Sequence, residues 1–355
     1  MPWLLLLMLL LSTYSHAKET QIYADMQLHA YTDTLALSEL IDNWGGSYHG
    51  GEKAFIYRFI DAGVSYRGWG LATVSEEYMT LAYSKDAADF FYLRENKLPL
   101  QQDYLYDIRF KAEYASVKGV QGFARYSVTD KFELFVGVSL LQGKELLSGT
   151  LQGQVRPLSS NDYDYEDVFV DYYYSEDRLF DRSVDAPQGQ GKSLRLALAW
   201  RFLDKHSLSL DIRNAYAYID WRETPYTYAQ VNADNKEYDA NGYVIVHPTL
   251  SGGHQSLSFR QQLPRFSQLD YSYQLAQRLS AKLTLFDTPI QRFYQLGAIF
   301  HPSLAHQFSA SYSALNGAIT LEYLGPWLKF AITSDTTSAN SAEQISLSLG
   351  LKYTL

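Results

Sequence analysis

The feature that most constrains the fold is a period-two alternation of apolar and polar residues, which recurs along the chain. In "YDIRFKAEY" (106–114), Tyr106 and every second residue after it are apolar or aromatic, and the residues between them are charged. Successive side chains of a β-strand point to opposite faces, so this segment predicts a strand with one apolar and one charged face. The same alternation fills "FELFVGVSL" (132–140), "SLRLALAWRF" (193–202) and "QISLSLGLKYTL" (344–355).

The connections between these segments are strongly unequal in length. Some are turns of a few residues, such as "TDK" (129–131) and "LDKH" (203–206), whereas others span 143–192 and 221–253. Short turns at one end and long loops at the other are typical of bacterial outer-membrane barrels, whereas a compact soluble domain seldom carries such loops. The 30 tyrosines of the chain fit the aromatic belts of membrane proteins. We therefore predict an all-β, transmembrane, antiparallel up-and-down barrel.

The C-terminal segment "SLGLKYTL" (348–355) resembles the signal by which the barrel-assembly machinery recognises outer-membrane proteins. The residues that carry the resemblance are Gly350, Tyr353 and Leu355, although the usual final residue is aromatic. The resemblance is to the broad class of Gram-negative outer-membrane β-barrels and points to no specific family. It implies outer-membrane lipids and, during biogenesis, the assembly machinery as partners.

The number of strands follows from the requirement that both termini face the periplasm and all long loops lie on the other side. The count is 14, an even number as in most bacterial barrels, with 12 and 16 as alternatives. The predicted strands are 21–29, 54–66, 70–83, 103–128, 131–142, 193–203, 206–220, 255–275, 281–287, 291–300, 305–313, 317–323, 326–333 and 343–355. The segment 255–275 is kept as one strand, with Pro264 as the site of a bend.

The N-terminus predicts export. Residues 4–11 form an apolar run with the length of a signal-peptide core, and Ser15-His16-Ala17 fits a cleavage site, although no basic residue precedes Lys18. We expect 1–17 to be a signal peptide and 18–355 a single barrel domain, located in the outer membrane. The chain has no cysteine, which excludes disulfides and thiol chemistry. Its formal net charge of −9 argues against a nucleic-acid partner.

Charged residues on the faces assigned to the barrel interior are the candidate functional residues. Charges of both signs line water-filled pores and set their selectivity, although the same charges could also pair with one another and fill the barrel. No cofactor or metal is expected. The predicted lumen-lining residues are Asp107, Arg109, Lys111, Glu113, Arg125, Arg195, Arg201, Asp211, Arg213 and Arg260.

The acidic, tyrosine-rich run from Asn161 to Asp185 lies in the middle of the longest predicted loop. Burying it in a core would require pairing or protonating many carboxylates, so we expect an exposed, mobile extracellular loop that gates the barrel mouth. "NDYDYED" (161–167) also offers oxygen ligands for a divalent cation, but it lacks the glycine and the twelfth-position ligand of an EF-hand.

These observations favour a porin-like channel for small hydrophilic solutes. The first alternative is a barrel that acts as an adhesin, receptor or accessory to a surface structure through its loops. A barrel enzyme is the second, and its only candidate pair is His254 and Ser256, predicted to share the inward face with Arg260. A fatty-acid-type transporter would also have 14 strands, but residues 30–53 cannot supply its N-terminal plug.

Overall fold

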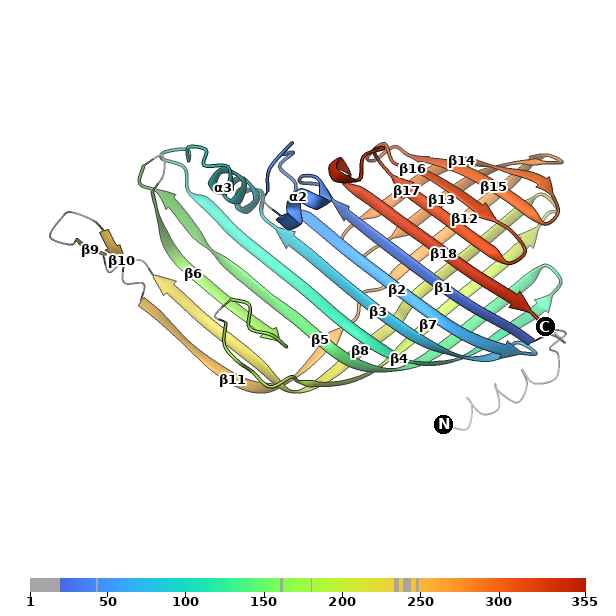
Figure 1. The fold of residues 1–355 in the computed structure, drawn as a ribbon, viewed down its shortest axis with the longest axis horizontal. Coiled ribbons are helices and arrows are strands. Elements are labelled where there is room, and N and C mark those ends of the chain that lie inside the picture. The colour runs from blue at the N-terminus through green and yellow to red at the C-terminus, as the bar shows by residue number, and fades with distance from the viewer. Residues whose placement is uncertain are drawn as a thin grey trace.

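The computed structural model describes residues 20–42, 44–159, 162–179, 181–232, 236–238, 244–246 and 249–355, and most of them lie in strands (Figure 1). No helix in this part of the chain has the length and apolar character needed to cross a membrane. Helices α2 (Leu37–Asp42) and α3 (Lys85–Glu95) and the 3-10 turn Ala339–Ser341 lie in connections. The strands are β1 (Thr20–Thr32), β2 (Lys53–Tyr66), β3 (Trp69–Tyr83), β4 (Tyr106–Thr129), β5 (Phe132–Pro157), β6 (Tyr163–Tyr174), β7 (Gln188–Phe202), β8 (His206–Asn232), β9 (Lys236–Tyr238), β10 (Val244–Val246), β11 (Thr249–Gln262), β12 (Phe266–Ala276), β13 (Leu279–Asp287), β14 (Arg292–Ser303), β15 (His306–Ser313), β16 (Ile319–Leu324), β17 (Leu328–Ser334) and β18 (Gln344–Thr354).

A closed 14-strand antiparallel ring forms the wall of the molecule. It runs β1–β2–β3–β4–β5–β7–β8–β12–β13–β14–β15–β16–β17–β18, and β18 returns to pair with β1. Tyr31 pairs with Gln344 at one end of this last seam and Gln21 pairs with Thr354 at the other. Closure leaves the ring without an unpaired edge, which a strand-built membrane protein requires. The predicted barrel and its strand number are confirmed.

The long strand predicted at 255–275 is one run of the wall with a break in it. β11 and β12 lie along the same edge of β8, where Gln262 pairs with Tyr218 and Phe266 pairs with Arg213. Residues 263–265 separate them, and Pro264 in this break cannot donate a backbone hydrogen bond to the ladder. The break changes which residues face inward, with a consequence for Arg260 described below.

The two ends of the barrel differ, as the unequal connections predict. At one end, which we call the turn end, the connections are as short as 67–68 and 130–131. The first strand of the ring begins at this end, and the last strand ends there. At the opposite end, the loop end, longer connections carry α2 and α3. Ser84 caps α3 by accepting a hydrogen bond from the Ala87 amide, and its hydroxyl also donates to the carbonyl of Asp107 on β4. The helix is thereby fixed to the top of the wall (Figure 1).

The ranges 143–192 and 221–253, predicted as long loops, are in large part strand where the structure describes them. The half of β5 nearer the turn end pairs with β7, and the half nearer the loop end pairs with β6. β8 pairs with the opposite edges of β7 and β6 in the same order. β6 therefore continues the wall above β7, and β4, β5, β6, β8 and β11 form a tall wall at the loop end (Figure 1). The predicted mobile loop did not include β6. That prediction rested on the charge of "YDYEDVFVDYYY", whereas the tyrosine and valine content of this segment favours a strand.

Side-chain hydrogen bonds hold the end of the acidic run against this tall wall. The hydroxyl of Tyr172 donates to the buried carboxylate of Asp177 at 2.7 Å, and Arg182 pairs with the same carboxylate and donates to the Thr227 hydroxyl at 2.6 Å. Burial and the neighbouring Asp177 carboxylate raise the pKa of Tyr172. The carboxylate is paired rather than exposed, so part of the run is built into the structure.

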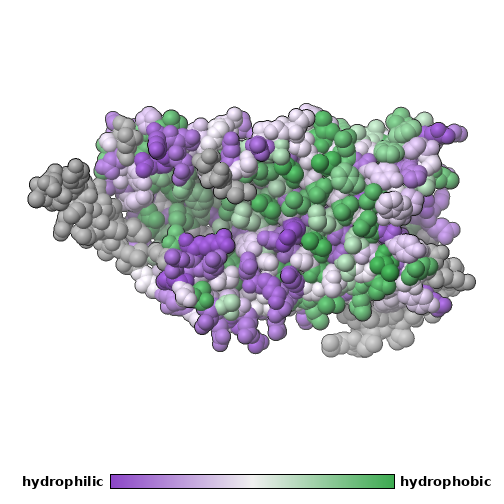
Figure 2. Space-filling view, viewed as in Figure 1, coloured by the Kyte–Doolittle hydropathy of each residue, from purple (hydrophilic) through white to green (hydrophobic). Residues whose placement is uncertain are grey.

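The outer face of the ring is apolar over the span between the two ends. Leu71, Leu140 and Leu296 expose more than 60% of their surface on this face, and Figure 2 shows hydrophobic side chains covering much of the wall. Exposed aromatic residues gather near the turn end: Tyr66, Trp69, Trp200, Phe300, Trp327 and Tyr353. An apolar band with an aromatic girdle around a closed barrel is the architecture of outer-membrane proteins. This confirms the predicted class and its outer-membrane location.

A candidate solute site in the barrel lumen

Three of the predicted lumen residues meet in the middle of the barrel. The Arg195 guanidinium donates to both oxygens of Asp211, at 3.1 and 2.7 Å, and lies 3.5 Å from the Asp61 carboxylate of β2 across the lumen. Arg213 lies over the ring of Phe59 with 3.6 Å between the guanidinium carbon and the ring centroid. Charges buried in a barrel need partners, and these residues supply partners to one another.

Sequence reasoning missed three polar members of this cluster. Asp61 and Glu76 are buried, and Asn214 donates to the Glu76 carboxylate at 2.8 Å and accepts from the Ser193 hydroxyl at 2.6 Å. A signal was available for Asp61, which continues the inward row of Phe55, Tyr57 and Phe59 at a spacing of two residues. An acid in an aromatic row of a strand marks a position that needs a specific partner.

The other predicted lumen residues lie at the two ends of the barrel. Near the turn end, Arg125 pairs with Glu133 at 3.1 Å, and Arg201 donates to the carbonyl of Asp130 at 2.8 Å. Toward the loop end, the upper half of β4 carries two pairs of neighbouring charges: Asp107 with Arg109, and Lys111 with Glu113. These predicted residues therefore lie in three separate groups, in the middle of the barrel, near the turn end and toward the loop end, and do not form one continuous row along the lumen.

Arg260 does not face the lumen, so its assignment was wrong. Phe259 packs against the buried cluster of the interior and Gln261 is 1% exposed, whereas Arg260, between them, points to the opposite face. There it pairs with Asp220 at 2.6 Å and lies over the ring of Tyr218. The error follows from carrying the face pattern of β12 through the break at 263–265 into β11.

The proposed His254 and Ser256 pair also takes the outer face of the tall wall. The His254 ring nitrogen lies 3.2 Å from the Tyr174 hydroxyl and 3.4 Å from the Thr227 hydroxyl, within the group that binds Arg182. His254 is an exposed side chain whose contacts are hydrogen bonds within the tall wall. Within the described residues no group of three or more His, Asp or Glu side chains is placed to hold a metal ion.

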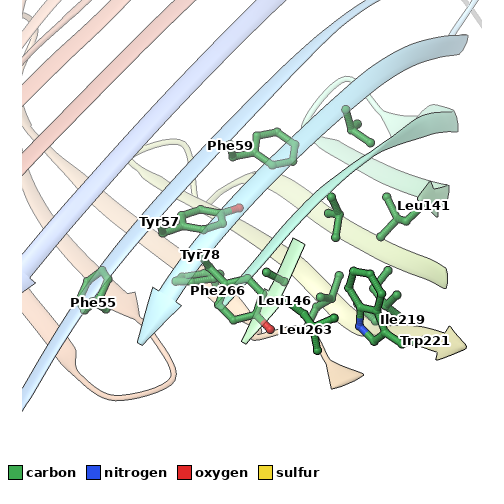
Figure 3. Packing of buried hydrophobic residues seen from close by; sticks show 14 of the residues in the cluster. Phe55, Tyr57, Phe59, Tyr78, Leu141, Leu146, Ile219, Trp221, Leu263 and Phe266 are labelled. Atoms are coloured by element: carbon green, nitrogen blue, oxygen red, sulfur yellow. The ribbon is translucent and has the colours of Figure 1, made fainter. Parts of the chain in front are cut away.

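Aromatic side chains close the middle of the lumen. The rings of Tyr57 on β2 and Phe266 on β12 stack with centroids 3.8 Å apart, and His29 on β1 lies 4.6 Å from Phe286 on β13. None of these strands is a neighbour of its partner in the ring, so the contacts cross the lumen. Figure 3 shows Tyr57 and other rings of β2 projecting into this packed interior. Direct contact requires the facing walls to approach the ~10 Å spacing of packed sheets, so the barrel is flattened at this level.

Below this layer the lumen opens toward the turn end. A cavity of about 1100 Å³ occupies the turn end, and a second of about 330 Å³ lies beside it against β1, β2, β4, β5 and β7. A narrow crevice of about 70 Å³ leads upward beside the aromatic rings. Lys329 of β17 lines all three, so the three spaces lie next to one another at this residue.

Apart from the charged Glu322 and Lys329 and the rings of Phe286 and Phe293, the crevice is lined mainly by neutral polar side chains. The Thr320 and Thr333 hydroxyls are 2.8 Å apart, and the His29 ring nitrogen lies 3.0 Å from the Ser346 hydroxyl. At its loop end the Asn316 amide donates to the Gln344 side-chain oxygen at 2.6 Å. With ~30 Å³ per water, the crevice holds about two water molecules. Small inward residues of β16 to β18 leave this space open: Thr320, Ala331, Thr333, Ser346 and Ser348.

Comparison with known proteins adds distant structural likeness only. No protein-family model matches the chain and no curated protein sequence matches it. The toluene transporter TodX of Pseudomonas putida is similar over 95% of this chain and 89% of its own, with 10% identity and a TM-score of 0.41. A FadL homologue of Pseudomonas aeruginosa covers the same shares with 10% identity and a TM-score of 0.34. The translocator domain of the autotransporter NalP from Neisseria meningitidis has 8% identity and a TM-score of 0.30. These values assign the chain to no family.

Proposed function

We propose that this protein is an outer-membrane channel for small hydrophilic solutes, which it conducts through the polar crevice rather than through an open central pore. The observation that carries the proposal is that three lumen spaces lie against Lys329, which places the hydroxyl-lined crevice next to the wide cavity at the turn end. With the turn end in the periplasm, the wide cavity is a periplasmic vestibule.

The aromatic layer restricts what can pass. The contact of Tyr57 with Phe266 blocks the lumen on the side of β2 and β12, so that the crevice on the side of β14 to β18 is the remaining route. A crevice with room for about two waters favours small polar molecules and ions, whose hydration its hydroxyl and amide groups can replace. The Asn316 to Gln344 hydrogen bond closes its upper end and is the natural gate.

Recordings in planar bilayers test this route with a matched pair of variants. Thr333 is 7% exposed and lines the crevice, whereas Ile332, its neighbour in β17, is 42% exposed on the outer face. Thr333→Trp should abolish the conductance, and Ile332→Trp should leave it unchanged. Absence of conductance in the wild-type protein, or equal loss in both variants, would remove the proposal.

The tall wall supports a second candidate function, a receptor or adhesin role at the cell surface. Five strands rise above the ring there, and the Asp177 hydrogen bonds hold a further segment against them, which conduction alone does not require. A barrel that folds, conducts nothing and loses binding to a surface partner when 161–185 is replaced would support this function.

A further inference from the structure

The two faces of the tall wall differ in what covers them. On the outer face, α3 packs over Tyr106 and Ile108 of β4, and Val184 of the segment after β6 packs over β6 and β8. The inner face continues the lumen wall beyond the aromatic layer, at the loop end. Its exposed side chains include Arg109, Lys111, Thr150, Gln152, Tyr228 and Gln255. This face is therefore accessible to a ligand that approaches from outside the cell.

Polar and aromatic side chains form rows across the inner face, from β4 through β5 and β6 to β8. Each row spans three strand spacings, or ~14 Å, which is long enough for a ligand of several linked units. The first row consists of Glu113, Ser148, Tyr173 and Tyr226. The second row, nearer the end of the wall, consists of Lys111, Thr150, Asp171 and Tyr228.

A recess of about 160 Å³ lies between these two rows. With ~30 Å³ per water, it holds about five water molecules, which is the scale of one sugar ring. Hydroxyl and carboxylate groups from four strands surround it, so hydrogen-bond donors and acceptors are both available. The lining residues include Glu113, Ser148, Thr150, Asp171, Tyr173 and Tyr226.

Asp171 places a free acceptor at this recess. Its Oδ1 atom accepts a hydrogen bond from the Thr150 hydroxyl at 2.6 Å, whereas Oδ2 has no hydrogen-bond partner among the described residues. The side chain is partly exposed, and Oδ2 is not among the buried unpartnered atoms, so a ligand can reach it. A hydroxyl group of a bound molecule can therefore donate to this oxygen.

The neighbouring charges on the inner face are paired with one another. Paired carboxylates and cations leave little net charge at the recess, so a neutral ligand that carries hydroxyl groups fits this face better than an ion does. The pairs are Asp107 with Arg109 at 3.1 Å, Lys111 with Glu113 at 3.9 Å, and Arg156 with Glu166 at 2.7 Å.

Tyr228 places an exposed aromatic ring beside Asp171. It pairs with Asp171 on β6 and with Gly253 on β11. A Cβ at Gly253 would lie 2.7 Å from the Tyr228 ring, so the ring leans across β11 over the space that the glycine leaves. One side of the ring then lies against the sheet while the other faces the mouth, and 38% of Tyr228 is exposed. An aromatic ring face next to hydrogen-bonding groups suits the apolar face of a sugar ring.

We infer that the inner face of the tall wall binds a neutral glycan chain outside the cell. One sugar occupies the recess and donates a hydroxyl hydrogen bond to Asp171 Oδ2, and the next packs against the ring of Tyr228. This inference goes beyond the proposed channel, because the glycan is held at the cell surface and does not enter the crevice.

Calorimetric titration of the full-length barrel with oligosaccharides tests the inference, in lauryldimethylamine oxide because its headgroup contains no sugar. The neutral probes are tri-N-acetylchitotriose, lacto-N-tetraose and maltotetraose, and the charged probes are the cationic glucosamine trimer and the anionic 3′-sialyllactose. At least one neutral probe should bind with a Kd below about 1 mM and more tightly than both charged probes. If no neutral probe binds, or if a charged probe binds most tightly, the inference is wrong.

Two variants locate the bound glycan on the inner face. Asp171→Asn should weaken binding about tenfold, the factor for one hydrogen bond to a charged group, and Tyr228→Ala should weaken it about fivefold. Asp220→Asn and Tyr165→Ala are the matched controls, because Asp220 pairs with Arg260 on the outer face and the 40% exposed Tyr165 contacts Tyr163 beside α3. Equal losses in the variants and their controls would contradict the site.

Heat-modifiable migration in gels shows that each variant is folded, and Gly253→Ala is an independent test of the same ring. Its Cβ would displace the Tyr228 side chain without removing any hydrogen-bonding group, so it should weaken binding as Tyr228→Ala does. Binding is measured without conductance. A barrel that binds a glycan and conducts nothing would disprove the channel alone, and a conducting barrel that binds no neutral probe would disprove this site alone.

Discussion

Tyr57 of β2 and Phe266 of β12 stack across the lumen with ring centroids 3.8 Å apart and an interplanar angle of 18°. The two strands lie on opposite sides of the ring, so this single contact shows that the walls meet in the middle of the barrel. The barrel is therefore a flattened one with a packed interior, and solute must pass beside the aromatic layer.

Removing the stack should widen the passage. The double substitution Tyr57→Ala with Phe266→Ala is expected to raise single-channel conductance and to lower stability by about 3–5 kcal/mol for each truncated ring. Because the rings contact one another, the two stability losses should not add. Recordings in planar bilayers and urea unfolding of both single variants and the double variant measure these effects. Strict additivity would show that the rings do not contact.

The closed upper end of the crevice gives a gating prediction. Asn316→Ala removes the hydrogen bond to Gln344 and should increase the fraction of time that the channel is open. Asn340→Ala changes the same residue type in the 3-10 turn Ala339–Ser341 and leaves the Asn316 to Gln344 hydrogen bond in place, so it is the matched control. An unchanged open probability in Asn316→Ala would show that this hydrogen bond is not the gate.

Lipid exposure is tested by adjacent positions in β7. Leu198 lies on the outer row of the strand with the exposed Trp200, and Ala199 lies on the inner row with Arg195. Arginine at Leu198 should cost less than the ~2–4 kcal/mol of the membrane midplane, because Leu198 lies two residues from Trp200 in the aromatic girdle, whereas arginine at Ala199 can extend into water at little cost. The two arginine variants are compared by their folding yields and by the urea concentrations at the midpoint of unfolding, both measured in lipid vesicles. A similar loss at both positions would contradict the assignment of inner and outer faces.

The C-terminal residues should be needed for closure as well as for recognition. Tyr353 pairs with Ile22 in the last seam, so deleting 353–355 shortens the pairing that closes the ring and should block membrane insertion. Gly350→Ala should have a smaller effect, because the atom that its Cβ would meet at 2.5 Å is Asp25 Oδ1, the free end of a side chain that can turn away. The amount of each variant in crude membrane fractions and its heat-modifiable migration in gels measure both effects. Normal insertion of the deletion would refute the assembly role.

The acidic run should be dispensable for the ring. β6 pairs only with the upper parts of β5 and β8, while β7 completes the ring below it. Replacing 161–185 by a short Gly/Ser link should leave heat-modifiable migration unchanged. A variant that fails to insert would show that the tall wall stabilises the barrel itself.

The alternation of apolar and polar residues was sufficient to predict the ring, because each membrane-spanning strand must place apolar side chains toward lipid and the others toward the lumen. This requirement acts on each strand separately, so it can be seen in the sequence of each strand. The alternation in "YDIRFKAEY" predicted the strand, and its apolar face packs against α3 through Tyr106, Ile108 and Phe110. It could not predict that Tyr57 meets Phe266, because contact across the lumen depends on how far the barrel is flattened. The alternation did not predict the face of Arg260, because the break of three residues between β11 and β12 changes which residues point inward. It also did not predict β6, because the acidic residues of this run suggested a loop although its tyrosine and valine content favours a strand.

Cysteine accessibility during single-channel recording tests the route most directly. The chain contains no cysteine, so one introduced thiol is unique. Small charged methanethiosulfonate reagents added to the open channel should react with Thr333→Cys and block the current. They should leave the current through Val117→Cys unaffected, because Val117 lies in the packed interior and its replacement leaves the aromatic rings in place. Block through Val117→Cys with no effect at Thr333→Cys would contradict the account and place the route through the centre of the barrel.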